Sequence, residues 1–409
     1  MLPGYLLRKP FVLTARVLPT IRHMKKSLSA LIGFSLLAFI QISCNPLSTA
    51  VFSKKTAREK YEDKLQKDSG KNNPAVNAWL NAAEYSLNDP LSIPSNYNES
   101  GRFTASNASA TSLKVFIKRG QKLTVQLNKT SSPYYAVYMD LWKAADSTTN
   151  SRLAHIITAD TANNRLEYIA EKDENVIVRY QPQISAGGSY FVSIAAAASF
   201  VFPISPSVKS YIGSFWGDGR DGGLRKHEGI DIFAPAKSPA VAVADGLITS
   251  VSENLLGGKI IFMQPENRNY NVYYAHLHEQ LVVPGQRVKA GEIIGLTGNT
   301  GNAKTTASHL HFGIYTFSGP VNPLAFVEQK KEAITSKLTT AVPRMMVTSR
   351  ATRVYADLSL LKPISTLDKN TSVHAEAISG NYYRVILPDG RKAFAEAKNL
   401  QLPKAVKIS

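Results

Sequence analysis

Five of the eight histidines of this 409-residue chain lie between residues 227 and 311, far more than an even distribution would place there. Two motifs carry most of them: HEGID at residues 227–231 and HLH at residues 309–311. Clustered histidines are typical of a metal or acid–base site, although two unrelated strands could carry them as ordinary polar residues. Because a metal–ligand bond is only about 2 Å long, a shared ion requires a fold that brings the two motifs to one point.

The HLH motif lies in the segment SHLHFGIYTF, whose β-branched and aromatic residues favour a strand. On a strand, residues i and i+2 point to the same side, about 6.6 Å apart at about 3.3 Å per residue. His309 and His311 are therefore expected to face one site together, with Leu310 and Phe312 directed into the core. A helix would direct the two histidines to different faces.

The HEGID motif requires a bend if it serves the same site. On a helix His227 and Asp231 would share a face, but the internal Gly229 and the following IDIFAP argue against a helix. A straight strand would separate the two by about 13 Å, too far for one ion. We predict a kinked strand or strand–loop in which Gly229 permits the bend.

Two histidines and one carboxylate leave a fourth coordination position open, which is the catalytic zinc pattern. A bound Zn²⁺ lowers the pKa of its water to about 7 and polarises a carbonyl group. Further histidines then move protons or stabilise the developing negative charge. The chain has no HExxH motif, so the common helical zinc-protease pattern is excluded.

The ordered motifs HEGIDI, YYAHL and SHLHF, with PGQRVKAGEIIGLTGNTG between the last two, resemble the LytM/lysostaphin-type metallopeptidases of the M23 family. The resemblance covers residues 205–326. It implies a mostly antiparallel β fold and zinc-dependent hydrolysis of peptide cross-links, carried by the stem peptides of bacterial peptidoglycan. Carried over position by position, it implies one Zn²⁺ held by His227, Asp231 and His311, with His276 and His309 as the catalytic histidines.

Several residues near these motifs have other interpretations. The resemblance gives Glu228 no role as a general base, and His278 is expected to face solvent. The glycine-rich segment before HEGID holds Asp218, Arg220 and Asp221, which are candidate substrate contacts or merely parts of a surface loop. The alternative function is a non-catalytic envelope adaptor that binds cell wall or activates another wall hydrolase. A third is a carbohydrate-binding lipoprotein led by residues 100–200.

The segment MKKSLSALIGFSLLAFIQISC at residues 24–44 has a basic start, an apolar run and a small residue before Cys44. This is the layout of a secretory signal, and it resembles a bacterial lipoprotein signal. The resemblance implies export to the cell envelope, lipidation of Cys44 and a membrane anchor, in the periplasm or at the outer membrane. Gln41 departs from that pattern, and a single uncleaved anchor is the alternative. Cys44 is the only cysteine, which rules out an internal disulfide.

The rest of the chain is expected to be mainly β. Residues 1–44 are the upstream extension and signal, and residues 45–99 are a tether with helices. The stretch NPAVNAWLNAAEYSL has Asn73 as N-cap and Pro74 at the first helical position. Turn-punctuated strands predict a β-sandwich over residues 100–204. A linker at 327–345 precedes a small C-terminal β-barrel at 346–409, which resembles bacterial SH3-like modules through YYRVILPDGRKAF.

The net charge of +18 suggests an anionic partner. The distribution of the charge weakens that suggestion for the region that holds the histidine motifs. Residues 201–326, which hold the histidine motifs, carry 10 basic and 9 acidic residues. The sequence shows no basic stripe interleaved with stacking aromatic residues, so nucleic-acid binding is not expected.

Overall fold

The protein is described by a computed structural model that covers residues 55–328 and 342–403, except residues 107, 130–134, 147, 149 and 360. The upstream extension, the signal segment and Cys44 lie outside the described residues, so the predicted lipid anchor stays a prediction. Within the described ranges, no helix is both long enough and apolar enough to span a membrane.

Two helices open the described chain, α1 (Ala57–Ser69) and α2 (Pro74–Asn88). Asn73 caps α2 as predicted, because its side-chain oxygen accepts hydrogen bonds from the backbone N–H groups of Ala75 and Val76. The apolar stripe of α2 is buried, and the Trp79 indole donates a hydrogen bond of 2.8 Å to the carbonyl of Pro182. The stripe therefore packs into the fold rather than offering a binding face.

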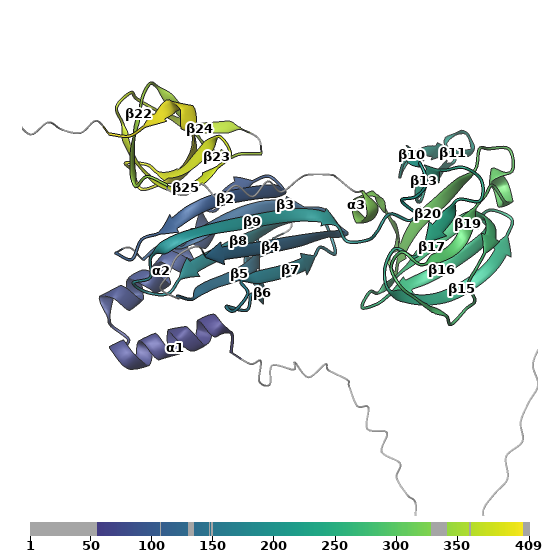
Figure 1. The fold of residues 1–409 in the computed structure, drawn as a ribbon, viewed down its shortest axis with the longest axis horizontal. Coiled ribbons are helices and arrows are strands. Elements are labelled where there is room, and N and C mark those ends of the chain that lie inside the picture. The colour runs from purple at the N-terminus through teal and green to yellow at the C-terminus, as the bar shows by residue number, and fades with distance from the viewer. Residues whose placement is uncertain are drawn as a thin grey trace, which may run out of the picture. The chain divides into compact units, whose positions relative to one another are not determined.

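A β-sandwich follows, in which sheet β6-β5-β8-β3-β1 faces sheet β2-β9-β4-β7 across a shared apolar core (Figure 1). Its first strand begins at Leu91. The strands are β1 (Leu91–Ile93), β2 (Asn96–Phe103), β3 (Thr111–Ile117), β4 (Gln121–Lys129), β5 (Val137–Lys143), β6 (Ala154–Thr158), β7 (Arg165–Ile169), β8 (Glu174–Pro182) and β9 (Gly188–Ala198).

The histidine motifs belong to a separate, antiparallel sheet with the strand order β10-β13-β20-β17-β16-β15-β18 and a core of its own. Its strands are β10 (Tyr211–Ser214), β13 (Ile230–Phe233), β14 (Pro239–Val241), β15 (Gly246–Asn254), β16 (Gly258–Pro265), β17 (Tyr270–Gln280), β18 (Arg287–Val288), β19 (Ile293–Thr297), β20 (His309–Thr316) and β21 (Gly319–Val321). The short strands β11 (Gly219–Arg220) and β12 (Arg225–Lys226) form a small hairpin before HEGID. A short helix, α3 (Leu324–Val327), closes the region.

The C-terminal strands enclose a third, smaller apolar core. They are β22 (Met345–Thr348), β23 (Thr352–Asp357), β24 (Lys362–Leu367), β25 (Ser372–Ser379), β26 (Tyr382–Ile386), β27 (Lys392–Glu396) and β28 (Leu400–Gln401). This module is hydrogen-bonded to the sandwich, because β1 pairs with β23 and β2 pairs with β25. The observed fold is mainly β, as expected, while the predicted domain boundaries and the SH3-like likeness stay predictions.

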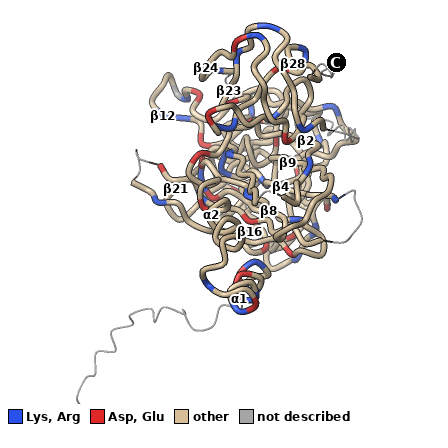
Figure 2. Tube along the Cα trace, turned by 90° about the vertical axis from the view of Figure 1, so that its left-hand side faces the viewer, with Lys and Arg blue, Asp and Glu red and all other residues tan. Residues whose placement is uncertain are grey.

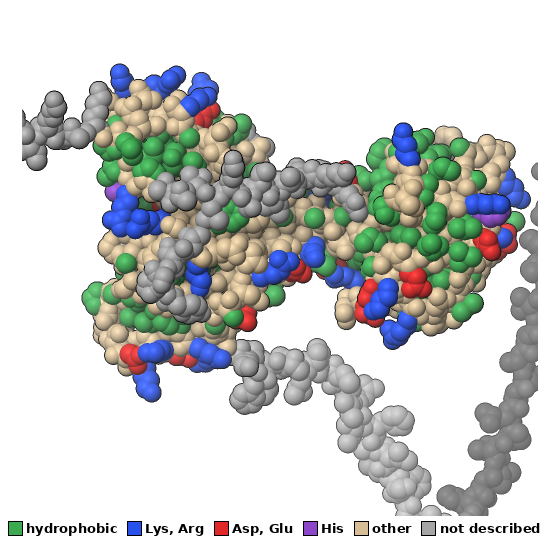
Figure 3. Space-filling model, viewed as in Figure 1, with side chains coloured by type: hydrophobic (Ala, Val, Ile, Leu, Met, Phe, Trp, Pro, Cys, Tyr) green, Lys and Arg blue, Asp and Glu red, His purple; other side chains and the backbone are tan. Residues whose placement is uncertain are grey.

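Charged residues are interspersed over the described chain. The tube view shows basic and acidic positions scattered along the chain (Figure 2). The space-filling view shows small groups of Lys and Arg, some beside Asp or Glu, rather than one continuous patch (Figure 3). The net charge is therefore not gathered into one docking stripe on the face shown.

Candidate metal and catalytic site

The sheet brings the two histidine motifs together by strand pairing. HLH begins β20, as predicted, and β20 lies between β13 and β17. Asp231 on β13 is the direct partner of His311 on β20, and Ala275 on β17 is the partner of His311 on the other side. Leu310 and Phe312 are fully buried behind the strand. The alternation of β20 thus directs His309 and His311 to one face.

His227, Asp231 and His311 converge on one point. His227 Nε2 lies 2.9 Å from His311 Nδ1 and 3.0 Å from Asp231 Oδ1, and His311 Nδ1 lies 2.9 Å from the same oxygen. His227 Nδ1 faces the carbonyl oxygen of Phe215 at 2.9 Å. Because a carbonyl only accepts, Nδ1 carries the hydrogen and Nε2 of the neutral ring is an acceptor. Two acceptors, His227 Nε2 and Asp231 Oδ1, therefore face each other at 3.0 Å. A cation between them would stabilise this arrangement.

This donor set fits Zn²⁺. Ligand atoms of a tetrahedral ion with bonds of 2.0–2.1 Å lie about 3.3 Å apart, close to the 2.9–3.0 Å observed here. Burial opposes ionisation of Asp231, yet the neighbouring His227 and His311 rings hold the pKa of its carboxyl well below the usual range. Burial lowers the pKa of His311, so its ring is neutral. A carboxylate and neutral imidazole rings are the forms in which Asp and His bind a metal ion.

His276 reaches the site through an unusual backbone conformation. Its φ is +61°, in the left-handed region, and the β16–β17 register is irregular at this position. A regular strand would send Ala275 and His276 to opposite faces, yet both line the same cleft. The bulge thus turns His276 toward His311, with the two ring centres 5.9 Å apart. Left-handed backbone at a non-glycine residue costs about 1–2 kcal/mol, and such strain clusters at functional sites.

His276 and His309 each direct one ring nitrogen to a backbone carbonyl and keep the other for the cleft. His276 Nδ1 lies 2.9 Å from the carbonyl oxygen of Thr300, and His309 Nδ1 lies 2.9 Å from that of Ala307. The Nδ1 atoms therefore carry the hydrogens, and the Nε2 atoms can accept a proton. Burial, followed by the nearby His309, lowers the pKa of His276 to about 4, so this ring is neutral at pH 7.

The site region is similar to known enzymes. Residues 225–323 match Peptidase family M23. The chain contains an M23 peptidase domain. It is 28% identical over 187 residues to the peptidoglycan DD-endopeptidase ShyC of Vibrio cholerae. The aligned region covers 45% of this chain and 40% of that protein. It is 35% identical over 126 residues to the L-Ala–D-Glu endopeptidase of Bacillus subtilis, covering 29% and 38%.

Among solved structures, the catalytic domain of the antimicrobial peptidase lysostaphin from Staphylococcus simulans is 32% identical to the matched part of this chain. The match covers 30% of this chain and 94% of that domain, with a TM-score of 0.27. The chain spans less than half the length of the two enzymes from Vibrio cholerae and Bacillus subtilis. The matches named here extend over less than half of the chain.

Other residues of the M23 domain hold the candidate metal ligands in place through hydrogen bonds. The sequence did not predict this role for them. Arg220, a candidate substrate contact, instead donates hydrogen bonds of 2.7 Å to Asp231 Oδ2 and to Ser214 Oγ. Asp231 is thereby held with Oδ1 toward the histidines. Asp218 accepts from Ser214 and from the backbone N–H of Phe215, which fixes the loop that carries the Phe215 carbonyl. Only the motif residues had a recognisable spacing, so these supports could not be predicted.

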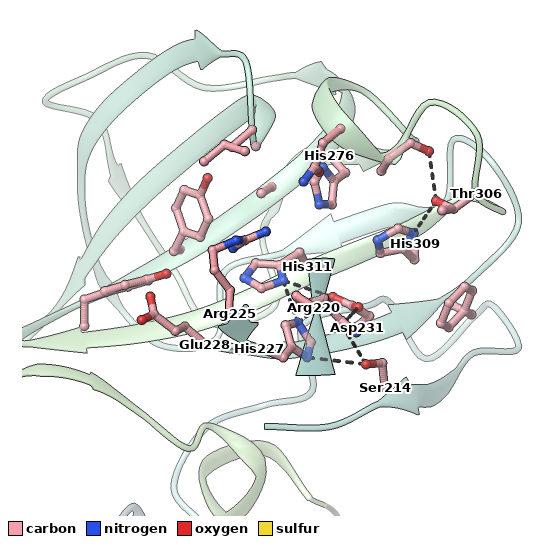
Figure 4. A pocket seen from close by; sticks show the side chains of 18 residues that line it. Ser214, Arg220, Arg225, His227, Glu228, Asp231, His276, Thr306, His309 and His311 are labelled. Atoms are coloured by element: carbon pink, nitrogen blue, oxygen red, sulfur yellow. Dashed lines mark hydrogen bonds and ion pairs between the residues drawn. The ribbon is translucent and has the colours of Figure 1, made fainter. Parts of the chain in front are cut away.

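The M23 domain opens a cleft of about 500 Å³ around these residues, lined by all five predicted metal and catalytic side chains (Figure 4). His278 is exposed and does not line the cleft, as predicted. Arg220 lines it, with Oδ2 of Asp231 as its partner. The structure thus gathers the five predicted residues into one open site, while their individual roles stay predictions.

The predicted bend in HEGID is observed, and the structure adds a steric reason for glycine at position 229. β13 begins at Ile230, and His227–Gly229 lie outside the strands. Gly229 does not have a positive φ. A Cβ atom at Gly229 would instead lie 2.6 Å from the Phe312 carbonyl oxygen and 2.7–2.8 Å from the His311 ring. Glycine is needed here for the close approach of the two motifs.

We expect Gly229→Ala to weaken metal binding in the M23 domain. The added methyl group has no room beside His311, so the ring must move and the ligand triangle must open. Zinc affinity is expected to fall about 10–100-fold, as when a metal ligand loses its support, and overpacking is expected to cost about 1–3 kcal/mol of stability. Competition with a chromogenic chelator and thermal unfolding measure the two effects.

Gly219→Ala is the matched control, because a Cβ there would meet only Gly223, at 3.8 Å. This variant is expected to bind zinc as the wild type does. Equal zinc affinity in Gly229→Ala and the wild type would contradict the steric explanation.

Proposed function

We propose that this protein is a zinc-dependent endopeptidase that hydrolyses peptide cross-links of bacterial peptidoglycan. The observation that carries the proposal is the convergence of His227, Asp231 and His311 within a cleft that His276 and His309 share. The M23 match supports it, because the similar enzymes from Vibrio cholerae and Bacillus subtilis are named as endopeptidases. A non-catalytic adaptor would not require five correctly disposed side chains.

The residues of the cleft have two roles in the proposed hydrolysis, metal binding and proton transfer. His227, Asp231 and His311 would hold the zinc ion, which when bound polarises the scissile carbonyl and acidifies water. His276 and His309 present Nε2 atoms that accept the proton of the attacking water and return it to the leaving amine. The water oxygen bonds to the carbonyl carbon, the C–N bond breaks, and the proton ends on the amine nitrogen. Once protonated, either ring also donates to the carbonyl oxygen as it gains charge.

Arg220 and Phe215 act through the ligands. The guanidinium of Arg220 fixes the second oxygen of Asp231, and the Phe215 carbonyl fixes the orientation of His227. Partners of this kind orient metal ligands and select the histidine tautomer. They explain why the glycine-rich segment before HEGID lies against the site.

We further propose that the chain is exported and anchored to a membrane of the cell envelope through a lipid on Cys44. The support is the signal-like segment at residues 24–44. An anchor there would leave the M23 domain on the side of the membrane where peptidoglycan lies. Metabolic labelling with a clickable fatty acid, in the wild type and in Cys44→Ala, tests this assignment.

The function is tested on purified peptidoglycan sacculi. We expect the protein to release soluble muropeptides, a zinc chelator to stop the release, and added Zn²⁺ to restore it. Mass spectrometry of the products identifies the bond that is cut. Binding to sacculi without any chelator-sensitive release would favour the adaptor. Polysaccharide binding that survives chelation would favour the carbohydrate-binding alternative.

A further inference from the structure

The loop between β19 and β20 contacts both histidines that the proposed hydrolysis uses for proton transfer. The His309 backbone N–H donates a hydrogen bond of 3.0 Å to the carbonyl of Gly298 in this loop. Two residues later, the Thr300 carbonyl accepts the hydrogen bond of 2.9 Å from His276 Nδ1. Both rings line the cleft, with their centres 5.0 Å apart (Figure 4). The short segment 298–300 therefore connects the two histidines.

The Thr300 side chain joins the two strands at the bulge that carries His276. The register of β16 and β17 shifts between Lys259 and Ile261, and Lys259 lies opposite Leu277. The Thr300 hydroxyl accepts a hydrogen bond of 3.0 Å from the Lys259 backbone N–H. It donates one of 2.9 Å to the Leu277 carbonyl. One hydroxyl group thus uses both its donor and its acceptor capacity to connect β16 to β17 directly beside His276.

Two glycines let this loop approach the turn between β15 and β16 closely enough for these hydrogen bonds. A Cβ at Gly258 would lie 2.1 Å from the Thr300 hydroxyl oxygen, and a Cβ at Gly301 would lie 2.3 Å from the Gly258 backbone nitrogen. Both glycines have a positive φ, +61° and +71° respectively, which other residues adopt only at a cost. The Leu256 carbonyl also accepts the Asn302 backbone N–H at 3.0 Å. The loop is therefore held in one position against the turn.

His276 needs external support because its own backbone is strained. Its φ of +61° is left-handed, and such a conformation persists at a non-glycine residue only where the surrounding structure holds it. The His276 backbone N–H donates to the Gly257 carbonyl at 2.7 Å, which fixes one side of the bulge. Thr300 fixes the other side and the ring. A regular strand would turn the His276 ring away from the cleft, so loss of this support is expected to displace Nε2.

We propose that Thr300 is a positioning residue for His276. Its hydroxyl holds the bulge and its carbonyl fixes the ring, so that Nε2 of His276 is directed into the cleft. This inference rests on the proposed function and adds a residue that acts on the reaction through His276. Thr300 itself does not line the cleft. Its effect on the rate follows from geometry, because a misplacement of about 1 Å can cost about 10²-fold.

The test compares Thr300→Val, which keeps the side-chain shape without the hydroxyl, with Thr300→Ser, which keeps the hydroxyl. The substrate is a soluble cross-linked muropeptide dimer. Thr300→Val is expected to lower kcat about 10–100-fold with the KM and the zinc content of the wild type. Thr300→Ser is expected to recover most of kcat. The control is Thr305→Val in the same loop, because Thr305 is exposed and does not line the cleft; it is expected to behave as the wild type.

Combining Thr300→Val with His276→Ala shows whether Thr300 acts through this histidine. In the His276→Ala background, Thr300→Val is expected to cause no further loss of kcat. A further loss as large as that in the wild-type background would overturn the inference, because Thr300 would then support the site as a whole. Wild-type kcat in Thr300→Val would overturn it as well.

NMR of nitrogen-labelled histidine side chains gives a second measurement that does not depend on activity. We expect His276 to hold its hydrogen on Nδ1 in the wild type and in Thr300→Ser, and to show a mixture of tautomers in Thr300→Val. The same single tautomer in all three proteins would contradict the positioning role. Absence of chelator-sensitive cleavage by the wild type would overturn the peptidase function instead, and the tautomers would still decide whether Thr300 positions His276.

Discussion

Replacing His311 with alanine is expected to abolish zinc binding and wall hydrolysis together. His311 Nδ1 lies within 2.9 Å of both other candidate ligands, so its loss opens the triangle and leaves two ligands. Loss of a supporting partner alone lowers metal affinity about 10–100-fold, and loss of a ligand is expected to exceed that range. Zinc per chain after dialysis and muropeptide release from sacculi measure the two effects in one preparation.

His309→Ala is the matched comparison, because His309 lies two residues away on the same face of β20 and its Nδ1 is bound to a backbone carbonyl. This variant is expected to keep zinc at the wild-type level and to lose about 10²–10⁴-fold in kcat, the range for a general acid or base. Full hydrolysis by either variant would disprove the division of roles. Loss of zinc in His309→Ala would move this residue into the ligand set.

The sequence predicted which residues form the site better than it predicted the backbone geometry that brings them together. The i, i+2 spacing of HLH placed two histidines on one strand face, and β20 shows that arrangement. The steric need for glycine at position 229 could not be predicted, because it comes from the His311 ring and the Phe312 carbonyl, which are remote in sequence. The left-handed backbone of His276 has no signature in YYAHL, since histidine rarely adopts it.

The strand pairing between the sandwich and the C-terminal strands could not be predicted from the sequence either. Both segments have strand-like alternation, and each was predicted to be a domain of its own. Alternation shows that a strand has a buried face, but it does not show which edge pairs with which. The pairing of Ser100 with Ile378 and of Ser92 with Asp357 unites them. Glu99 and Arg384 are each one of several charged residues in their segments, and nothing in the sequence indicated that these two would meet.

Arg384→Met is expected to destabilise this part of the protein strongly. The Arg384 and Glu99 side chains are 1% and 0% exposed and contact each other through two hydrogen bonds of 3.1 Å. The Tyr97 and Tyr190 hydroxyls donate to the same carboxylate at 2.7 Å and 2.8 Å. Removing the guanidinium leaves a buried carboxylate without its counter-charge, which costs about 3–5 kcal/mol. Urea unfolding followed by tyrosine and tryptophan fluorescence measures the loss.

The control is Arg391→Met in the same module, whose partner Asp389 and own side chain are each 50% exposed. An exposed pair contributes at most about 1 kcal/mol, so this variant is expected to unfold almost as the wild type does. The double variant Glu99→Gln with Arg384→Met removes both charges and is expected to recover part of the loss. A loss in Arg384→Met no larger than that in Arg391→Met would show that the buried pair does not hold the two segments together.

The same pair predicts how stability depends on pH. Burial opposes ionisation of Glu99, but the charge of Arg384 and its hydrogen bonds hold the pKa of this carboxyl below its ordinary value of 4.5. Since the folded pKa is the lower one, the contribution of Glu99 is complete above about pH 4.5 and is lost as the pH falls through the folded value. Between these limits the wild type is expected to lose stability more steeply than Glu99→Gln. Parallel curves for the two proteins would assign the acid sensitivity to other carboxyl groups.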